Sequence, residues 1–237
     1  AFIYTCMVSV FVQLILLPHL FPRLHAGGGL FIGCPDSMAL NQLAVDMAEK
    51  IRISGWGVWM LRPHNQSPAG IASIIYALTW SKLWVLIPLN AALHASAFLI
   101  IFQLINLFIK NQINSFLCVL PFLVFPSNLQ WTAQLHKDGF SILGSVLILY
   151  SVVILIKSGN LENKDWHLLI FRAIIFYLGG VFLIWLVRPY MLMIIKFFML
   201  LLSPLLIVTF FVRGLNGILS RQKILAALGV FFIGLLI

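Results

Sequence analysis

The chain has 237 residues, of which 62% are apolar and only 9% are charged, and its mean hydropathy is +1.07. A soluble domain carries about 25% charged residues, so this composition excludes an ordinary soluble protein and indicates one that folds in lipid. The formal net charge is +9. Because the cations stand at the ends of apolar runs, we assign them to lipid headgroups and membrane orientation, and we expect no nucleic-acid partner.

The apolar runs are continuous rather than alternating, which favours helices over the strands of a membrane barrel. We therefore predict an all-α, polytopic transmembrane bundle of about seven spans. The predicted spans are 1–21, 83–109, 113–125, 139–156, 168–187, 190–212 and a last one from 224 onward. The sequence starts without Met and stops inside an apolar run, so we expect a fragment whose C-terminus is missing, with 1–237 forming a single domain.

The long polar interval 22–82 is predicted to be the first extracytoplasmic loop. In it, apolar residues recur at 40, 43, 44, 47, 48 and 51, which is the period of an amphipathic helix. A second short helix is expected over 71–80, and we expect both helices to lie along the membrane interface. Trp56 and Trp59 are assigned to headgroup depth. The glycine run 27–29 is expected to be flexible, and Asp46 to pair with Lys50 one turn later.

Alternation of the spans places 21–82, 126–138 and 188–190 on one face of the membrane. Most cations of the short loops fall on the other face, which the positive-inside bias assigns to the cytoplasm. We therefore expect an integral protein of a bacterial inner membrane whose functional face is periplasmic or extracellular.

Asp36 is the first acid of the long loop. It stands where an Asp can cap a helix, and a carboxylate there can also accept a proton from an acceptor hydroxyl or bind a metal. Arg62 and His64 flank a proline near two tryptophans. They suit interfacial anchoring or, alternatively, contacts with a lipid phosphate or with sugar hydroxyls.

Lys137 and Asp138 stand where the second polar loop enters span four. Asp138 can cap that helix, and a helix N-terminus beside Lys137 can hold a phosphate. Arg188 follows an apolar run directly and can either snorkel to the interface or bind a phosphate. His94 inside span two is expected to be a hydrogen-bonded packing residue. Phosphate-loop, hydrolase and dinucleotide motifs are absent from the sequence, and its three cysteines form no zinc pattern.

Three stretches resemble the GT-C class of membrane glycosyltransferases, including bacterial relatives of the protein mannosyltransferase and aminoarabinose transferase families. They are PDSMALNQLA (35–44), GWGVWMLRPHNQSPAGIASIIYAL (55–78) and FPSNLQWTAQLHKDG (125–139). LVRPY (186–190) also looks like membrane proteins of polysaccharide gene clusters, including repeat-unit polymerases. The resemblance is one of layout with loosely matching motifs, and it covers residues 1–190.

The resemblance implies transfer of a sugar from a polyprenyl-phosphate donor to an envelope glycan or lipid acceptor on the non-cytoplasmic face. Asp36 would then be the catalytic base or a metal-linked carboxylate. Lys137 or Arg188 would hold the donor phosphate, and Asp138 would assist acceptor or metal binding. A divalent metal ion is the candidate cofactor, although Asp36 has no adjacent acid. The alternatives are an O-antigen-type repeat-unit polymerase and a transporter of lipid-linked glycans.

Overall fold

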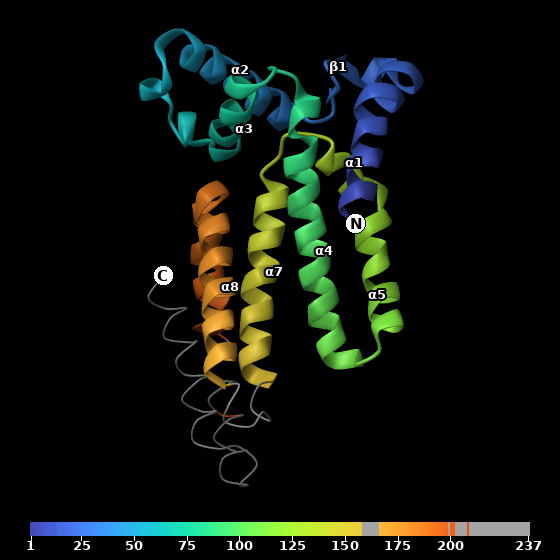
Figure 1. Cartoon of the computed structure of the whole chain (residues 1–237), viewed down its shortest axis with the longest axis vertical. Coiled ribbons are helices and arrows are strands. Elements are labelled where there is room, and N and C mark those ends of the chain that lie inside the picture. The colour runs from blue at the N-terminus through green and yellow to red at the C-terminus, as the bar shows by residue number, and fades with distance from the viewer. Residues whose placement is uncertain (158–165, 199, 202–207, 209–237) are drawn as a thin grey trace. The chain divides into compact units, whose positions relative to one another are not determined.

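The computed structural model describes residues 1–157, 166–198, 200, 201 and 208, and it forms two compact units, 1–143 and 144–237. The described residues are mainly helical (Figure 1), as the all-α prediction requires. Among the described residues, three helices are long and apolar enough to cross a membrane: Phe2–Leu20, Leu83–Ile109 and Leu168–Val187. A bent pair of helices would make a fourth. About half of the sixth predicted span, the whole seventh and most of loop 157–167 lie outside the described residues.

The first span contains an internal proline. Helix α1 (Phe2–Phe11) continues directly as a π-helix (Val12–Leu20) that contains Pro18. Proline cannot donate the hydrogen bond of a normal helical turn and its ring crowds the preceding carbonyl, and the wider turn accommodates both defects. The helix ends at Phe21, before a short turn at Pro22–Leu24.

The glycine run that we expected to be flexible forms the turn of a small antiparallel ribbon. Strand β1 (His25–Gly27) pairs with β2 (Leu30–Phe31). Gly27, Gly28 and Gly29 all have positive φ angles, a backbone conformation that costs glycine little. The ribbon is followed by α2 (Pro35–Ser54).

Helix α2 has the predicted amphipathic pattern, and its apolar face packs on another helix. It packs on α3 (Ser67–Leu78), and the two helices share a buried cluster that includes Leu40, Ala44, Ala72 and Tyr76. Small residues permit the close approach, and a Cβ on Gly70 would overlap the carbonyl of Leu61. The apolar face of α2 is therefore covered by another helix, and the interfacial location of the two helices stays a prediction.

Hydrogen bonds from polar side chains also connect α2 to α3. Arg52 donates to the backbone carbonyls of Tyr76, Ala77 and Thr79, so a cation sits at the C-terminus of α3, where the helix dipole favours it. Asp46 accepts a hydrogen bond from Gln42 (2.8 Å) instead of forming the predicted pair with Lys50. Two short helical turns, Trp56–Val58 and Pro63–Asn65, connect α2 to α3.

The next elements of the first unit follow the predicted spans closely. A short turn (Leu83–Leu86) leads into α4 (Ile87–Ile109), and Asn111 caps α5 (Gln112–Val124) with its side chain. The chain then bends by 60° into α6 (Pro126–Thr132), a helix in a stretch that we predicted to be a polar loop. Pro126 starts this helix, and Leu129 and Thr132 bury one side of it.

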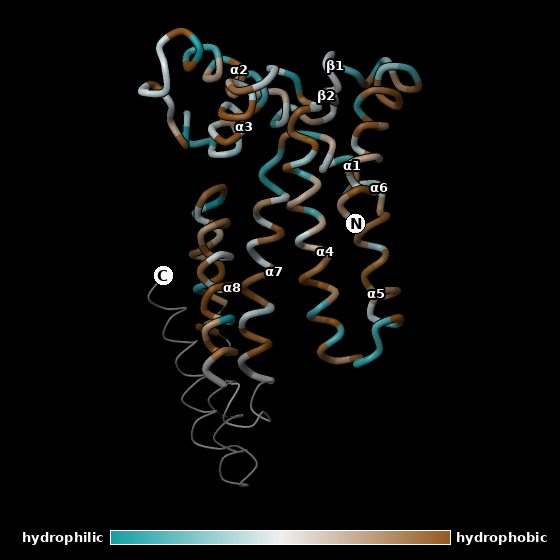
Figure 2. The backbone as a smooth tube through the Cα atoms, in the orientation of Figure 1, coloured by the Kyte–Doolittle hydropathy of each residue, from teal (hydrophilic) through white to brown (hydrophobic). Residues whose placement is uncertain are grey.

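Helix α7 (Asp138–Lys157) begins in the first unit and continues into the second, where α8 (Trp166–Val187) follows. Within the second unit, Gly144 and Gly180 bring α7 and α8 so close that a Cβ on either would lie under 3 Å from the backbone of the other. The helix breaks at Arg188 and resumes as Pro189–Phe198. Figure 2 shows that α4, α5, α7 and α8 are mainly hydrophobic, while α2 alternates between hydrophilic and hydrophobic residues.

Candidate functional site

A turn of chain from Thr132 to Asp138 forms the centre of the candidate site in the first unit. Asn90 on α4 holds this turn, since its amide nitrogen donates to the carbonyls of Thr132 (3.0 Å) and Gln134 (2.8 Å). Gln13 on the π-helix donates to the carbonyl of Ala133 between them. Three successive carbonyls are thus satisfied by two buried amides, which fixes the backbone from which His136, Lys137 and Asp138 emerge.

Gln134 joins the two polar stretches of the sequence. Its amide nitrogen donates to the carbonyl of Gly29 (2.8 Å), and its oxygen accepts from the backbone N–H of Phe31 (3.2 Å) and the hydroxyl of Ser37 (3.3 Å). The side chain is fully buried. Its hydrogen bonds therefore connect the segment 132–138, which carries Lys137, to the ribbon and to the first turn of α2, where Asp36 lies.

A ladder of small polar side chains lines the buried face of the first span. Thr5, Ser9 and Gln13 are four residues apart, so they lie on one side of the helix, and all three are buried. The Thr5 hydroxyl is 3.2 Å from His94 Nδ1, and the Ser9 hydroxyl is 3.2 Å from that of Thr132. The ladder ties the first span to α4 and α6 by polar contacts inside a membrane-length bundle.

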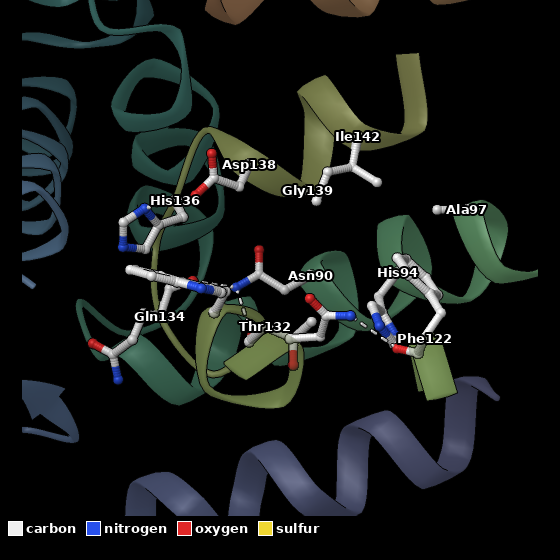
Figure 3. Close-up of a pocket in the computed structure, with 12 residues that line it drawn as sticks. Asn90, His94, Ala97, Phe122, Thr132, Gln134, His136, Asp138, Gly139 and Ile142 are labelled. Carbon is white, nitrogen blue, oxygen red and sulfur yellow. Dashed lines mark hydrogen bonds and ion pairs between the residues drawn. The ribbon is translucent and has the colours of Figure 1, made fainter. Parts of the chain in front are cut away.

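A small pocket, called the polar pocket for the seven polar residues in its lining, opens beside this turn, between α4, α6 and the start of α7 (Figure 3). Its volume is about 40 Å³. His136 Nδ1 lies 3.7 Å from an oxygen of Asp138, and the Trp131 ring meets the His136 ring edge-on at 4.4 Å between centroids. The His94 ring stacks on Phe122 at 4.8 Å. The polar lining residues are Asn90, His94, Asn128, Thr132, Gln134, His136 and Asp138.

A larger apolar groove lies on the other side of α6. Its volume is about 390 Å³, within the roughly 300–1,000 Å³ of common ligand pockets. Its walls come from the first span, the ribbon region and α6, through Val8, Phe11, Val12, Leu16, Leu17, Phe21, Leu24, Phe31, Pro126, Leu129 and Gln130. Helix α6 therefore presents Leu129 and Gln130 to the groove and Asn128 and Trp131 to the polar pocket.

The predicted site residues fall into three groups. Asp36 is exposed in the first turn of α2, where its charge favours the helix dipole, but Cys34 rather than Asp36 occupies the capping position. Lys137 and Asp138 are partly buried on the turn that Gln134 fixes to α2. The carbonyl of Lys137 accepts the first helical hydrogen bond of α7, so Asp138 is a first-turn residue and not the predicted cap. These three residues lie at the same end of the unit.

Arg62 and His64 stand apart from that group. They flank Pro63 in the connection that follows the C-terminus of α2, at the far end of the hairpin from Pro35 (Figure 1). His64 is exposed in a left-handed conformation with φ of 47°. Arg188 belongs to the second unit, at the break between α8 and the next helix, where its backbone N–H donates to Ile184 (2.7 Å).

The described residues contain no group of three or more His, Cys, Asp or Glu side chains that could hold a metal ion. A divalent metal bound between Asp36 and Asp138 therefore lacks a third side-chain ligand of this kind in the described part. Cys34 is buried, and burial, followed by the nearby charge of Asp36, raises the pKa of its thiol. A thiol held protonated in this way is a poor nucleophile at neutral pH.

The sequence interpretation missed Gln13, Gln134 and the two hydroxyls of the ladder. The signal was present, because Thr5, Ser9 and Gln13 recur with the four-residue spacing of one helix face. Single hydroxyl residues barely change the hydropathy of a span, so they pass unnoticed among leucines and phenylalanines.

Comparisons with protein families, curated proteins and solved structures found no match to this chain.

Proposed function

We propose that this chain is a membrane glycosyltransferase that moves a sugar from a polyprenyl-phosphate donor to a hydroxyl of a glycan or lipid acceptor. The observation that carries the proposal is the apolar groove of about 390 Å³ beside α6. A donor of this class has a long apolar chain, which such a groove suits. The groove is built on a helix apolar enough to cross a membrane, so a lipid chain can reach it from the bilayer.

Asp36 and Lys137 take the two chemical roles in this proposal. Asp36 accepts the proton of the acceptor hydroxyl, whose oxygen then bonds to the anomeric carbon of the sugar. The bond between that carbon and the donor phosphate breaks, and the lipid phosphate leaves with the electron pair. Lys137, at the N-terminus of α7, stabilises the departing phosphate together with the helix end. The contacts of Gln134 support this pairing, because they anchor both stretches of chain at one end of the unit.

The test is Asp36→Asn in the full-length protein, read out by mass spectrometry of lipid-linked and envelope glycans. Removing a general base costs about 10²–10⁴-fold in rate, so transfer should fall by at least about 100-fold. Asp46→Asn is the matched control, since Asp46 is also an acid of α2 and accepts a hydrogen bond from Gln42. Full transfer by Asp36→Asn would eliminate Asp36 as the base. Glycans that are unchanged when the gene is deleted would eliminate the function.

A second candidate, transport of a lipid-linked glycan, is favoured by a different observation. Polar side chains inside membrane spans and broken helices are typical of transporters. The first unit has buried Thr5, Ser9, Asn90 and His94 within candidate spans, and its α5–α6 pair is bent by 60°. Movement of a labelled lipid-linked glycan across proteoliposomes, without any covalent change, would select transport over transfer.

A further inference from the structure

We propose that one edge of the α2–α3 hairpin docks into the headgroup layer of the bilayer, where Lys82 binds lipid phosphate. This edge, which we call the docking edge, consists of Ile53, Leu78, Trp80, Lys82 and Trp84. It is a different surface from the apolar face of α2, which α3 already covers. The proposal concerns how the hairpin meets the membrane, and it does not depend on the proposed transfer reaction.

Arg52 brings the two segments of the docking edge together. Its guanidinium group donates to the backbone carbonyl of Thr79 (3.1 Å) and to the hydroxyl of Ser81 (3.3 Å). The end of α2 therefore lies against the chain that leads from α3 into the next helix. Ile53 follows Arg52 directly, and Trp80 stands between the two partners of the guanidinium group.

The side chains of the docking edge are exposed although they are large and apolar. The exposed fraction is 85% for Ile53, 69% for Leu78 and 64% for Trp80. Apolar surface left in water costs about 25 cal/mol per Å², and exposed apolar patches mark sites where a membrane or another protein binds. The rings of Trp80 and Trp84 are 5.7 Å apart between centroids, so the two tryptophans form one surface.

The candidate span Leu83–Ile109 selects the membrane as the partner. At 1.5 Å per residue its 27 residues extend about 40 Å, which matches a hydrocarbon core with its headgroup layers. Trp80 and Trp84 stand at its first turn and thus at headgroup depth, where tryptophan is enriched. Leu83 and Leu86 are buried in the same cluster as α2 and α3, which fixes the hairpin to the start of the span (Figure 1).

The charges at the docking edge complement lipid phosphate. Arg52 and Lys82 are the charged residues of segments 51–54 and 76–86, and both are cations. The guanidinium group of Arg52 is engaged by the protein, whereas Lys82 forms no ion pair with an acid in the part of the chain that the structure describes. A lysine side chain can place its stem along apolar surface and extend its ammonium group to the headgroups.

The experiment attaches a nitroxide to Leu78→Cys in the full chain, after Cys6, Cys34 and Cys118 are replaced by alanine. The protein is placed in nanodiscs of phosphatidylcholine and phosphatidylglycerol. Electron paramagnetic resonance then compares collisions of the label with oxygen, which concentrates in lipid, and with a water-soluble nickel chelate. We expect collisions with oxygen to dominate at position 78. Asp46→Cys, an exposed position on the polar side of α2, is the matched control and should show the reverse.

Two results would overturn the docking. A label at position 78 that meets the nickel chelate as readily as the label at position 46 would show that the edge faces water. A label shielded from both reagents would show that protein, such as a second copy of this chain, covers the edge. Ile53→Cys, labelled in the same way, provides an independent second reading and should agree with position 78.

Lys82→Glu tests the contact with phosphate by the same measurement. Reversal of the charge repels the anionic headgroups, so the label at position 78 should shift toward water and its ratio of oxygen to nickel collisions should fall. Lys50→Glu is the control, since Lys50 is an exposed lysine of the same hairpin outside the docking edge, and the ratio should stay at the parent value. An unchanged ratio in Lys82→Glu would show that Lys82 does not bind lipid phosphate, and that part of the proposal would be wrong.

Discussion

Two helix contacts in this chain are built from opposite chemistry. In the first unit, the first span meets α4 and α6 through buried polar pairs, Thr5 with His94 and Ser9 with Thr132. In the second unit, α7 and α8 meet through Gly144 and Gly180, with Ile148, Tyr177 and Ile184 packed around them. Lipid tails are as apolar as leucine, so helices in a membrane associate by close packing or by hydrogen bonds rather than by hydrophobic exclusion.

This difference indicates which of the two contacts can lie beside a binding site for a polar ligand. A contact between glycines excludes water and depends on shape, and it supplies no polar side chain that could bind a ligand. A polar contact fixes the backbone and also leaves oxygens and nitrogens near the cavities, as Asn90 does beside the polar pocket. The proposed function accordingly concerns the first unit. The predictions that follow test this distinction, from the largest expected effect to the smallest.

Gly180→Leu should produce the largest loss of stability. Even a Cβ at this position would lie 2.6 Å from the carbonyl oxygen of Gly144, so α7 and α8 must separate. Overpacking costs about 1–3 kcal/mol and occasionally more. Thermal unfolding in detergent would report the change. Gly179→Leu is the matched control, because a Cβ there meets nothing within 4 Å. Equal destabilisation by both variants would mean that Gly180 is not the point of contact.

The sequence predicted those helices whose bounds follow from the length of an apolar run or from the period of its apolar residues. The bilayer thickness dictates the length of an apolar run. The turn Leu83–Leu86 together with α4 accordingly matches the prediction of 83–109, and α8 matches 168–187 within two residues. The period of apolar residues likewise predicted α2, because the period reports that one face is buried.

Periodicity does not report what buries a face. Helix α2 covers its apolar side with α3, a partner that becomes known only once the chain has folded back. Helix α6 was mistaken for a loop, since Ser127, Asn128 and Gln130 are typical of turns, while Pro126 and the burial of Leu129 and Thr132 favour a helix. The same-end location of Asp36 and Lys137 was anticipated from span counting, but the residue that joins their segments, Gln134, was not.

Asn90→Leu tests the polar side of the comparison. The change removes both hydrogen bonds to the turn and leaves the carbonyls of Thr132 and Gln134 buried without them. An unsatisfied buried group costs about 1–3 kcal/mol, so we expect a loss in that range on thermal unfolding. Asn114→Leu is the control, since its exposed side chain on α5 serves no such role. A stability equal to the parent would show that the amide does not hold the turn.

Tyr76→Phe tests a single hydrogen bond outside the spans. The Tyr76 hydroxyl donates to Asn41 across the α2–α3 hairpin (2.7 Å), and its loss should cost about 1 kcal/mol at neutral pH. Burial raises the pKa of Tyr76. Because the folded state then resists ionisation, the parent should keep its stability below the ordinary tyrosine pKa of about 10 and lose it as the pH rises further.

The Tyr76→Phe variant should lose less stability than the parent over that alkaline range, because it has no hydroxyl at this site to ionise. Unfolding midpoints measured between pH 8 and pH 11 would give the comparison. Identical losses in both proteins would place the alkaline sensitivity at other tyrosines.

The Ser9–Thr132 pair should give the smallest effect and the sharpest comparison. Hydrogen bonds between membrane helices contribute about 0.6 kcal/mol on average, because the unfolded chain in lipid also finds partners for its polar groups. The two hydroxyls are 3.2 Å apart, and that of Thr132 also contacts the carbonyl of Leu129 on its own helix (2.8 Å). A double-mutant cycle with Ser9→Ala and Thr132→Val isolates the contact between helices from the one within α6.

A coupling near 0.6 kcal/mol would mean that the ladder contributes modestly to stability and acts mainly by positioning α6 between the two cavities. A coupling of 2 kcal/mol or more would instead make the polar pair as important to its unit as the glycines are to α7 and α8, and the distinction between the two contacts would fail.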